Sequence, residues 1–253
     1  MNQRPDHGSP DYGIDAPGLV RNFALAGISA FAASIFFYYS FAETRPVQAG
    51  LVVGFGVIWG VLGLGAAALM VLSSRRGKLK ERDRILDSIP WRGDERVLDA
   101  GCGRGLMLIG AAKRLTSGVA VGVDAWREKD PSGNGPEAAL ANARAEGVEE
   151  RIEILEGDLS ELPFKDESFD VILSSLILHN IQEREERATA VRGLTRILKP
   201  GGRIVILDIW DTGEYAKSLR EAGMQDVSRS GLRFNIFPPA RLVTARKPAS
   251  GEV

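Results

Sequence analysis

The sequence predicts an α/β fold, with a parallel sheet covered by helices on both faces, preceded by a two-helix transmembrane hairpin. Three observations support this prediction. Two long uncharged apolar segments lie near the N-terminus, short β-branched strands then alternate with helices, and the first strand runs into a glycine-rich turn. Such alternation implies a parallel sheet that binds its ligands at the carboxyl ends of its strands.

The composition limits the class of protein. A chain of 253 residues, 44% apolar and 26% charged, is long enough for one large core, or for one core with an appendage. A net charge of -1 argues against a nucleic-acid binder that depends on bulk basic charge. The single cysteine, Cys102, excludes an internal disulfide and a cysteine-based metal cluster, and we predict no metal ligands.

The N-terminal part of the chain divides into a tail and a hairpin. Residues 1–18 combine prolines, glycines and acids without apolar periodicity, so we expect a disordered tail. The hairpin covers residues 19–74, with helices at about 22–42 and 47–74, and each helix has the roughly 20 residues that cross a bilayer. The alternative is two buried helices of a soluble protein, but the remaining chain offers too little surface to cover them.

Glycine spacing and flanking charge characterise this hairpin further. The Gly50-x-x-x-Gly54 and Gly56-x-x-x-Gly60 spacings allow close helix approach, either within one chain or between two chains of a homodimer. A basic juxtamembrane linker at residues 75–84 carries six Lys or Arg residues against two acids. By the positive-inside rule this is a multi-pass protein of the cell membrane, with both termini and residues 85–253 in the cytoplasm. The basic linker could bind anionic lipid headgroups, or it could be a solvated helix with its charges on the outer face.

The glycine-rich turn is the main candidate for ligand binding. Within RVLDAGCGRG, Asp99 precedes Gly101, Gly103 and Gly105. Glycine permits positive φ and close approach to a ligand at a helix start. The spacing differs from the G-x-G-x-x-G of dinucleotide sites, and a carboxylate here attracts an ammonium group and repels a pyrophosphate. The turn therefore favours a site for S-adenosylmethionine over the dinucleotide site of an NAD-dependent dehydrogenase. The other alternative is a glycine-rich turn that has only a structural role.

Two further acids follow predicted strands. We expect strands at 119–123, 152–155, 169–176, 203–209, 225–231 and 240–245, and helices at 106–115, 136–146, 187–198 and 214–222. Asp124 ends the second strand, where a carboxylate can accept both ribose hydroxyls. Asp158 follows the third strand, where it can accept from an adenine amine while Leu159 packs on the ring. One such acid would be an ordinary loop residue, whereas three on successive strand ends indicate a nucleotide-type site.

Residues 85–253 resemble the class I S-adenosylmethionine-dependent methyltransferases. The segments VLDAGCGRG, GVDAW, EGDLSELPFKDESFDVILSS and RILKPGGRIVI are similar to the motifs of that superfamily in order and spacing. The small-molecule branch with the ubiquinone and menaquinone methyltransferases is the most similar in character. The resemblance implies a Rossmann-like seven-stranded, mostly parallel sheet with its last strand antiparallel. The long polar stretch 126–136 and the hairpin depart from the plain family pattern and leave the acceptor open.

The resemblance also implies roles for individual residues: Asp99 and the glycines for the methionine moiety, Asp124 for ribose and Asp158 for adenine. The predicted cofactor-binding residues are Asp99, Gly101, Cys102, Gly103, Gly105, Asp124, Ala125, Asp158, Leu159 and Ser174. Cys102 is interpreted as a small residue that fills the loop rather than a nucleophile. His179 is the candidate general base, with packing or helix capping as the alternative role. Asp208 and Asp211 are weaker candidates.

We therefore expect a membrane-anchored methyltransferase that transfers a methyl group from S-adenosylmethionine to a small, lipophilic or membrane-associated acceptor. No nucleic acid partner is expected. The alternative is a non-catalytic S-adenosylmethionine-binding sensor or scaffold at the membrane. The intact acidic and glycine positions favour the enzyme.

Overall fold

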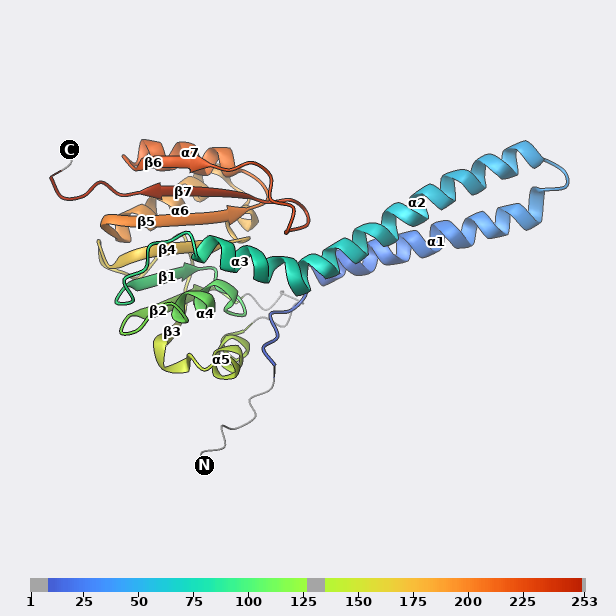
Figure 1. The fold of residues 1–253 in the computed structure, drawn as a ribbon. Coiled ribbons are helices and arrows are strands. Elements are labelled where there is room, and N and C mark those ends of the chain that lie inside the picture. Colours follow the sequence, from blue (N-terminus) through green and yellow to red (C-terminus); the bar gives the residue numbers. More distant parts are fainter. Residues whose placement is uncertain (1–8, 127–134, 252–253) are drawn as a thin grey trace, which may run out of the picture. The chain divides into compact units, whose positions relative to one another are not determined.

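The computed structural model describes residues 9–126 and 135–251 (Figure 1). It divides into two compact units. One is formed by residues 13–77, and the other combines the segment that ends at Tyr12 with residues 78–253. Most of the predicted polar insertion at 126–136 therefore lies outside the described residues.

The first unit is a helical hairpin. Its helices are α1 (Pro17–Phe41) and α2 (Pro46–Leu72), and α2 continues into a π-helical turn, Ser73–Gly77. Each long helix begins at a proline, whose fixed φ suits the first helical position. The Asp15 backbone N–H donates to Ser74 Oγ over 2.9 Å and so joins the two open ends of the hairpin.

One of the two predicted glycine spacings packs the hairpin. A Cβ at Gly56 would lie 1.7 Å from Ser34 Oγ, and one at Gly60 would lie 2.5 Å from an aromatic ring of α1. Gly50 and Gly54 instead have open space around them. Close packing of α1 and α2 within one chain therefore accounts for the Gly56 and Gly60 spacing. Gly50 and Gly54 take no part in this packing.

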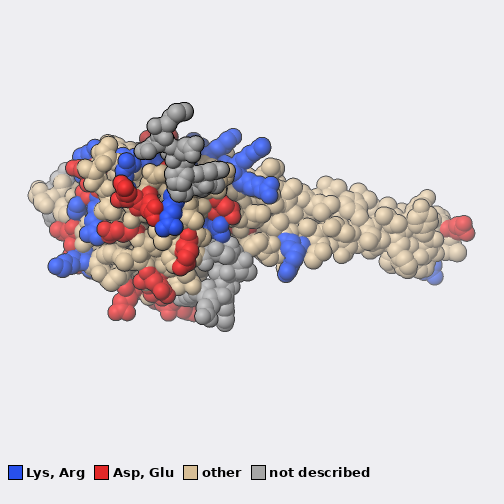
Figure 2. All heavy atoms as spheres, turned by 90° about the horizontal axis from the view of Figure 1, so that it is seen from below, with Lys and Arg blue, Asp and Glu red and all other residues tan. Residues whose placement is uncertain are grey.

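The outer surface of the hairpin is apolar. Both helices are long and apolar enough to cross a membrane, a test that the core helix of a soluble protein or a signal sequence also passes. A core helix is mostly buried, whereas only 11% and 22% of the most apolar windows of these helices are buried. In the view of Figure 2, charged side chains on the hairpin gather near its two ends.

The second unit contains a seven-stranded sheet in the order β3-β2-β1-β4-β5-β7-β6. The strands are β1 (Arg96–Ala100), β2 (Val119–Asp124), β3 (Ile152–Glu156), β4 (Phe169–Ser175), β5 (Leu198–Asp208), β6 (Gln225–Arg229) and β7 (Arg241–Arg246). β7 pairs antiparallel with both of its neighbours, β5 and β6, and the other strand pairs are parallel. The predicted Rossmann-like, mostly parallel sheet is confirmed.

Helices cover both faces of this sheet, as predicted. They are α3 (Lys78–Leu86), α4 (Leu106–Ala112), α5 (Pro136–Ala145), α6 (Arg184–Ile197) and α7 (Thr212–Glu221), with short 3-10 turns at Glu149–Arg151 and Leu178–Asn180. Successive strand residues point to opposite faces. Val97 accordingly packs with α3, α4 and α5, whereas Leu98 packs with α6 and α7.

Several predicted element boundaries are wrong by two or more residues; α1, for example, begins at Pro17 rather than near 22, and α6 at Arg184 rather than at 187. Two of the differences have a visible cause. The fifth strand begins at Leu198 rather than at 203, because Leu198 pairs with Phe169 before a shift in register. The helix predicted at 106–115 ends at Ala112, because the last turn tightens: the Leu115 N–H donates to the Ala112 carbonyl.

The disordered tail predicted for residues 1–18 is wrong where the structure describes ordered contacts. The Asp11 N–H donates to Asn142 Oδ1 over 2.8 Å, and Tyr12 Oη donates to Glu146 Oε1 over 3.2 Å. Hydrogen bonds to a folded domain can order a polar segment that has no apolar periodicity of its own. Residues 1–8 lie outside the described part.

The linker predicted at residues 75–84 is helical. Its first residues complete the π-helical turn, and the rest form most of α3. Lys78, Glu81 and Arg82 are buried, so residues 78–84 are part of the domain rather than a solvated connection. A helix is one of the two expectations for this segment, and the structure shows that it packs on α4.

Candidate cofactor site

A cavity of about 770 Å³ lies at the carboxyl ends of the first four strands. Its size falls in the range of small-ligand sites, roughly 300–1,000 Å³. Its lining residues are Gly101, Asp124, Ala125, Trp126, Gly157, Asp158, Leu159, Ser160, Ile177, Asn180, Ile181, Gln182, Glu183 and Glu186. The structure thus brings half of the predicted cofactor-binding residues into the cavity lining, whereas Asp99, Cys102, Gly103, Gly105 and Ser174 are not part of that lining.

Glycine is required at the start of the glycine-rich turn. Gly101, Gly103 and Gly105 have φ values of +79°, +50° and +83°, a region that side chains disfavour. A Cβ at Gly101 would also lie 2.5 Å from the Ile177 side chain, which lines the same cavity. Glycine therefore allows Ile177 to pack directly against the turn.

Asp124 connects this turn to the second strand. Its Oδ2 accepts from the Gly103 N–H over 2.8 Å, and its Oδ1 accepts from the Trp126 N–H over 3.1 Å. A carboxylate offers about four acceptor positions. Asp124 can thus hold the turn and still accept hydrogen bonds from a ligand in the cavity.

Asp99 and Ser174 carry buried polar atoms that no described residue satisfies. They stand on adjacent strands, since Ala100 pairs with Ser174. Asp99 Oδ2 accepts from the Leu108 N–H over 2.8 Å, but Asp99 Oδ1 and Ser174 Oγ are buried without a partner among the described residues. Unsatisfied buried polar atoms are rare and point to a missing ligand or water. Because Asp99 pairs with Leu173 and Ala100 with Ser174, the two side chains lie on opposite faces of the sheet and are separate sites rather than one pair. The Asp99 oxygen can accept from an ammonium group.

Burial also changes the titration of Asp99. It raises the pKa of this carboxyl to about 7, and the nearby Asp124 charge adds to the rise while the Leu108 N–H opposes it. Burial thus favours the protonated carboxyl, and a cationic ligand would stabilise the ionised form and lower this pKa.

Cys102 lies below the turn with its side chain in the core. It is 5% exposed, and a Cβ at Gly122 would lie 2.7 Å from its Sγ. Burial raises the pKa of the thiol. These contacts support the interpretation of Cys102 as a residue that fills space.

The acid after the third strand forms a local turn. Asp158 Oδ1 accepts from the backbone N–H and the hydroxyl of Ser160, over 2.9 and 2.8 Å. The carboxylate is exposed at the cavity, and Leu159 beside it is buried. An adenine site at these two residues stays a prediction.

His179 stands beside the cavity rather than in its wall. Its ring is 16% exposed, while Ile177, Asn180 and Ile181 line the cavity. His179 Nδ1 lies 2.6 Å from Oδ1 of Asp208, which is fully buried. A carboxylate only accepts hydrogen bonds, so Nδ1 donates to it, and in the neutral ring Nε2 then carries the lone pair.

The sequence did not reveal this pairing. Asp208 was a weak candidate base, but the structure makes it the partner that orients His179, because β4 and β5 are adjacent and their carboxyl ends meet. Strand order is not visible in a single sequence. Asp211 instead lies 3.5 Å from Arg187, away from the histidine pair.

The comparisons with known proteins agree with this architecture. Residues 98–206 match the family described as "Methyltransferase domain". Over these residues the chain matches a methyltransferase domain, and the seven-stranded sheet and the relatives given below agree with the class I S-adenosylmethionine-dependent type. The predicted family, its cofactor and its enzyme class are confirmed for this domain.

Relatives of the methyltransferase domain include a putative methyltransferase of Encephalitozoon cuniculi, 35% identical over 138 residues, which are 54% of each chain. A ubiquinone/menaquinone biosynthesis C-methyltransferase of Dinoroseobacter shibae is 29% identical over 158 residues, 62% of this chain and 56% of the relative. The chain therefore spans about half the length of these curated relatives.

Solved structures share the fold. The [4+2]-cyclase SpnF has a TM-score of 0.56 at 20% identity, over 68% of this chain and 82% of its own. A geranyl diphosphate methyltransferase, solved with GPP and sinefungin, has a TM-score of 0.55 at 15% identity, over 72% and 82%. Since a cyclase and a methyltransferase both resemble this domain, the fold alone does not fix the reaction.

Proposed function

We propose that this protein is a membrane-anchored methyltransferase that transfers a methyl group from S-adenosylmethionine to a small, lipophilic or membrane-associated acceptor. The observation that carries the proposal is the cavity, which joins the glycine-rich turn, Asp124 and Asp158 at the carboxyl ends of three adjacent strands. The relatives named as quinone-biosynthesis methyltransferases support a lipophilic acceptor.

The residues at the cavity fit the three parts of the cofactor. Asp99, which is buried next to the glycine-rich turn and outside the cavity lining, would offer an unpartnered carboxylate oxygen to the ammonium group. Asp124 would offer carboxylate oxygens to the ribose hydroxyls, and Asp158 and Leu159 would hold the adenine. When bound, S-adenosylmethionine supplies a methyl group already activated on a sulfonium. The task of the protein is then mainly to align the acceptor atom.

An acceptor that must lose a proton needs a base, and His179 is suited to this role. Its Nε2 is the free acceptor, since Nδ1 faces Asp208. Asp208 is fixed in turn by the Ile209 N–H at 2.8 Å and by Tyr215 Oη at 3.3 Å. A base oriented by a buried carboxylate is a common arrangement for proton abstraction.

Contacts at the base of the hairpin support its membrane topology. Lys78 Nζ donates to the Tyr12 carbonyl over 2.8 Å, so the residues on either side of the 13–77 unit are neighbours in one domain. A segment that leaves and rejoins the same domain crosses a membrane an even number of times. With the basic residues at 75–84, this supports a cytoplasmic domain and cytoplasmic termini at the cell membrane. The unused Gly50 and Gly54 pair supports a homodimer through α2.

Calorimetric titration of the full chain in detergent tests the cofactor part of the proposal. S-adenosylmethionine and S-adenosylhomocysteine should bind in the micromolar range, NADH should not compete, and Asp124→Ala should abolish binding. Transfer of a labelled methyl group into a membrane lipid extract then tests for an acceptor. Binding without transfer to any fraction would favour a sensor, and absence of binding in a folded sample would reject the proposal.

A further inference from the structure

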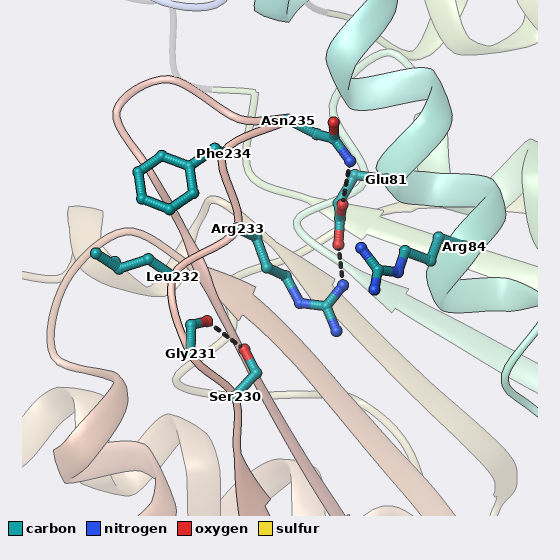
Figure 3. Close-up of a pocket in the computed structure, with 8 residues that line it drawn as sticks. All are labelled: Glu81, Arg84, Ser230, Gly231, Leu232, Arg233, Phe234 and Asn235. Carbon is teal, nitrogen blue, oxygen red and sulfur yellow. Dashed lines mark hydrogen bonds and ion pairs between the residues drawn. The ribbon is translucent and has the colours of Figure 1, made fainter.

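A second pocket, of about 370 Å³, lies between α3 and the loop that joins β6 to β7 (Figure 3). Its lining residues are Glu81, Arg84, Ser230, Gly231, Leu232, Arg233, Phe234 and Asn235. None of them lines the candidate cofactor cavity. Methyl transfer alone therefore leaves this pocket unexplained.

Buried polar contacts hold the loop to α3. The Glu81 carboxylate is fully buried, and it accepts from Arg233 Nη1 and, over 2.9 Å, from Asn235 Nδ2. A buried ion pair with a second hydrogen bond fixes geometry, because breaking it would leave a buried charge. The loop is thus fastened to the first turns of α3.

The pocket has an excess of positive charge. Glu81 neutralises Arg233, while Arg84 is exposed and has no ion-pair partner among the described residues. The Arg233 Nε is buried and also lacks a partner within the described chain. In Figure 3 the Arg84 and Arg233 guanidinium groups point toward one another. Two facing guanidinium groups with free donors suit a phosphate.

Exposed apolar side chains flank these arginines. In the described part of the domain, large apolar side chains that are exposed are Leu155, Trp210, Leu232 and Phe234. Phe234 is 76% exposed, and Figure 3 shows Leu232 and Phe234 on the opposite side of the loop from Arg84. Exposed apolar residues next to cations are typical of surfaces that enter a membrane interface.

The covalent chain brings this loop within reach of the proposed membrane. Glu81 is the fourth residue of α3, which begins directly after the 13–77 unit. At 1.5 Å per helical residue, roughly one turn separates the exit of the hairpin from the anchor of the loop. The loop also belongs to the carboxyl edge of the sheet, since β7 begins where Arg241 pairs with Asp208, the last residue of β5.

We infer that residues 230–235 and Arg84 form a surface that docks on the bilayer. An anionic phospholipid places its phosphate between Arg84 and Arg233, and Leu232 and Phe234 enter the interface. The inference rests on the proposed membrane anchoring and deepens it. Docking through this loop turns the carboxyl edge of the sheet, and with it the cofactor cavity, toward a lipid-borne acceptor.

Spin labels at three matched glycines test the inference in the full chain, reconstituted in nanodiscs of phosphatidylcholine with phosphatidylglycerol. Gly231→Cys, Gly193→Cys and Gly65→Cys place labels on the loop, on α6 and on α2, at positions where a Cβ meets nothing within 4 Å. The native Cys102 is buried, so the unsubstituted protein gives the background. Collisional access of each label to oxygen and to a water-soluble nickel chelate is measured.

The Gly231 label should have an oxygen-to-nickel access ratio several-fold above that of the Gly193 label. Arg84→Gln or Phe234→Ser should lower it toward the Gly193 value, while Arg220→Gln on α7 should leave it unchanged. A Gly231 ratio equal to that of Gly193, or no response to Arg84→Gln, overturns the docking surface if the Gly65 label is in lipid. A Gly65 label in water instead rejects the membrane anchoring itself.

Discussion

Asp99 combines a raised pKa with an unpartnered oxygen, so its charge state should control cofactor binding. In the ligand-free domain its pKa is about 7, and an ammonium ligand binds the ionised form. The affinity for S-adenosylmethionine should therefore rise about tenfold or more from pH 5.5 to pH 7, a range in which an α-amino group stays protonated. Titration calorimetry checks this. Asp99→Asn should bind weakly at both values, and a wild-type affinity that is flat with pH would contradict the role of Asp99.

The Asp99 carboxyl should also make the stability of the fold depend on pH. Cofactor affinity should rise with pH, whereas stability should fall. The folded pKa of Asp99 lies above the ordinary value of 3.8, so the folded protein binds more protons than the unfolded chain between about pH 4 and pH 7. Stability of the ligand-free protein should fall as pH rises through this window. Asp99→Asn should reduce the loss, by up to about 4 kcal/mol. Urea unfolding of both proteins at pH 5 and pH 8 measures the difference.

The histidine pair gives a prediction about turnover. If His179 is the base, His179→Ala should lower kcat by about 10²–10⁴-fold, with little change in cofactor affinity. Asp208→Asn should also lower kcat, because it removes the carboxylate that orients Nδ1. Added imidazole should partly restore His179→Ala but not Asp208→Asn. Unchanged turnover in His179→Ala would assign the residue to packing.

At the scale of elements, the segment before α1 supports the glycine-rich turn. Asn142 of α5 is 4% exposed, and its Nδ2 donates to the carbonyls of Asp11 and Arg104, each over 2.9 Å. Arg104 Nε also donates to the Asp11 carbonyl over 2.7 Å. The turn, α5 and the N-terminal segment therefore form one polar network.

Asn142→Ala should destabilise the protein by about 1–3 kcal/mol, because it leaves buried backbone groups without partners. It should also weaken cofactor binding, since the turn loses a support. Arg144→Ala on the same helix removes only an exposed ion pair with Glu149 and should change stability by less than about 0.5 kcal/mol. Equal thermal unfolding temperatures for the two variants would contradict the role of the network.

The sequence predicted those elements whose signals are local. The glycine-rich turn, Asp124 and Asp158 follow apolar runs directly, so their position at the carboxyl edge of a parallel sheet can be inferred without knowing strand order. The pairing of His179 with Asp208 depends on that order. The contact between Glu81 and Arg233 joins residues 152 positions apart, so no local sequence pattern indicates it. The ordered structure of residues 9–12 likewise depends on hydrogen bonds to the distant Asn142.

At the scale of the whole molecule, the hairpin topology predicts opposite accessibility for its tip and for the domain. In intact cells, a membrane-impermeant maleimide should label Glu43→Cys, which lies between α1 and α2, and should spare Gly193→Cys until the cells are lysed. The buried native Cys102 should stay unlabelled in both. Labelling of both positions, or of neither, before lysis would contradict a hairpin with a cytoplasmic domain.

The hydrogen bond from Lys78 to the Tyr12 carbonyl means that the hairpin is an insertion into a domain that closes upon itself. The hairpin is then a removable module. Replacing residues 13–77 by a few glycines should yield a water-soluble protein that keeps the Asp11 and Tyr12 contacts and binds S-adenosylmethionine with the affinity of the full chain. The same protein should lose activity on acceptors embedded in bilayers while it still methylates a short-chain, dispersed analogue.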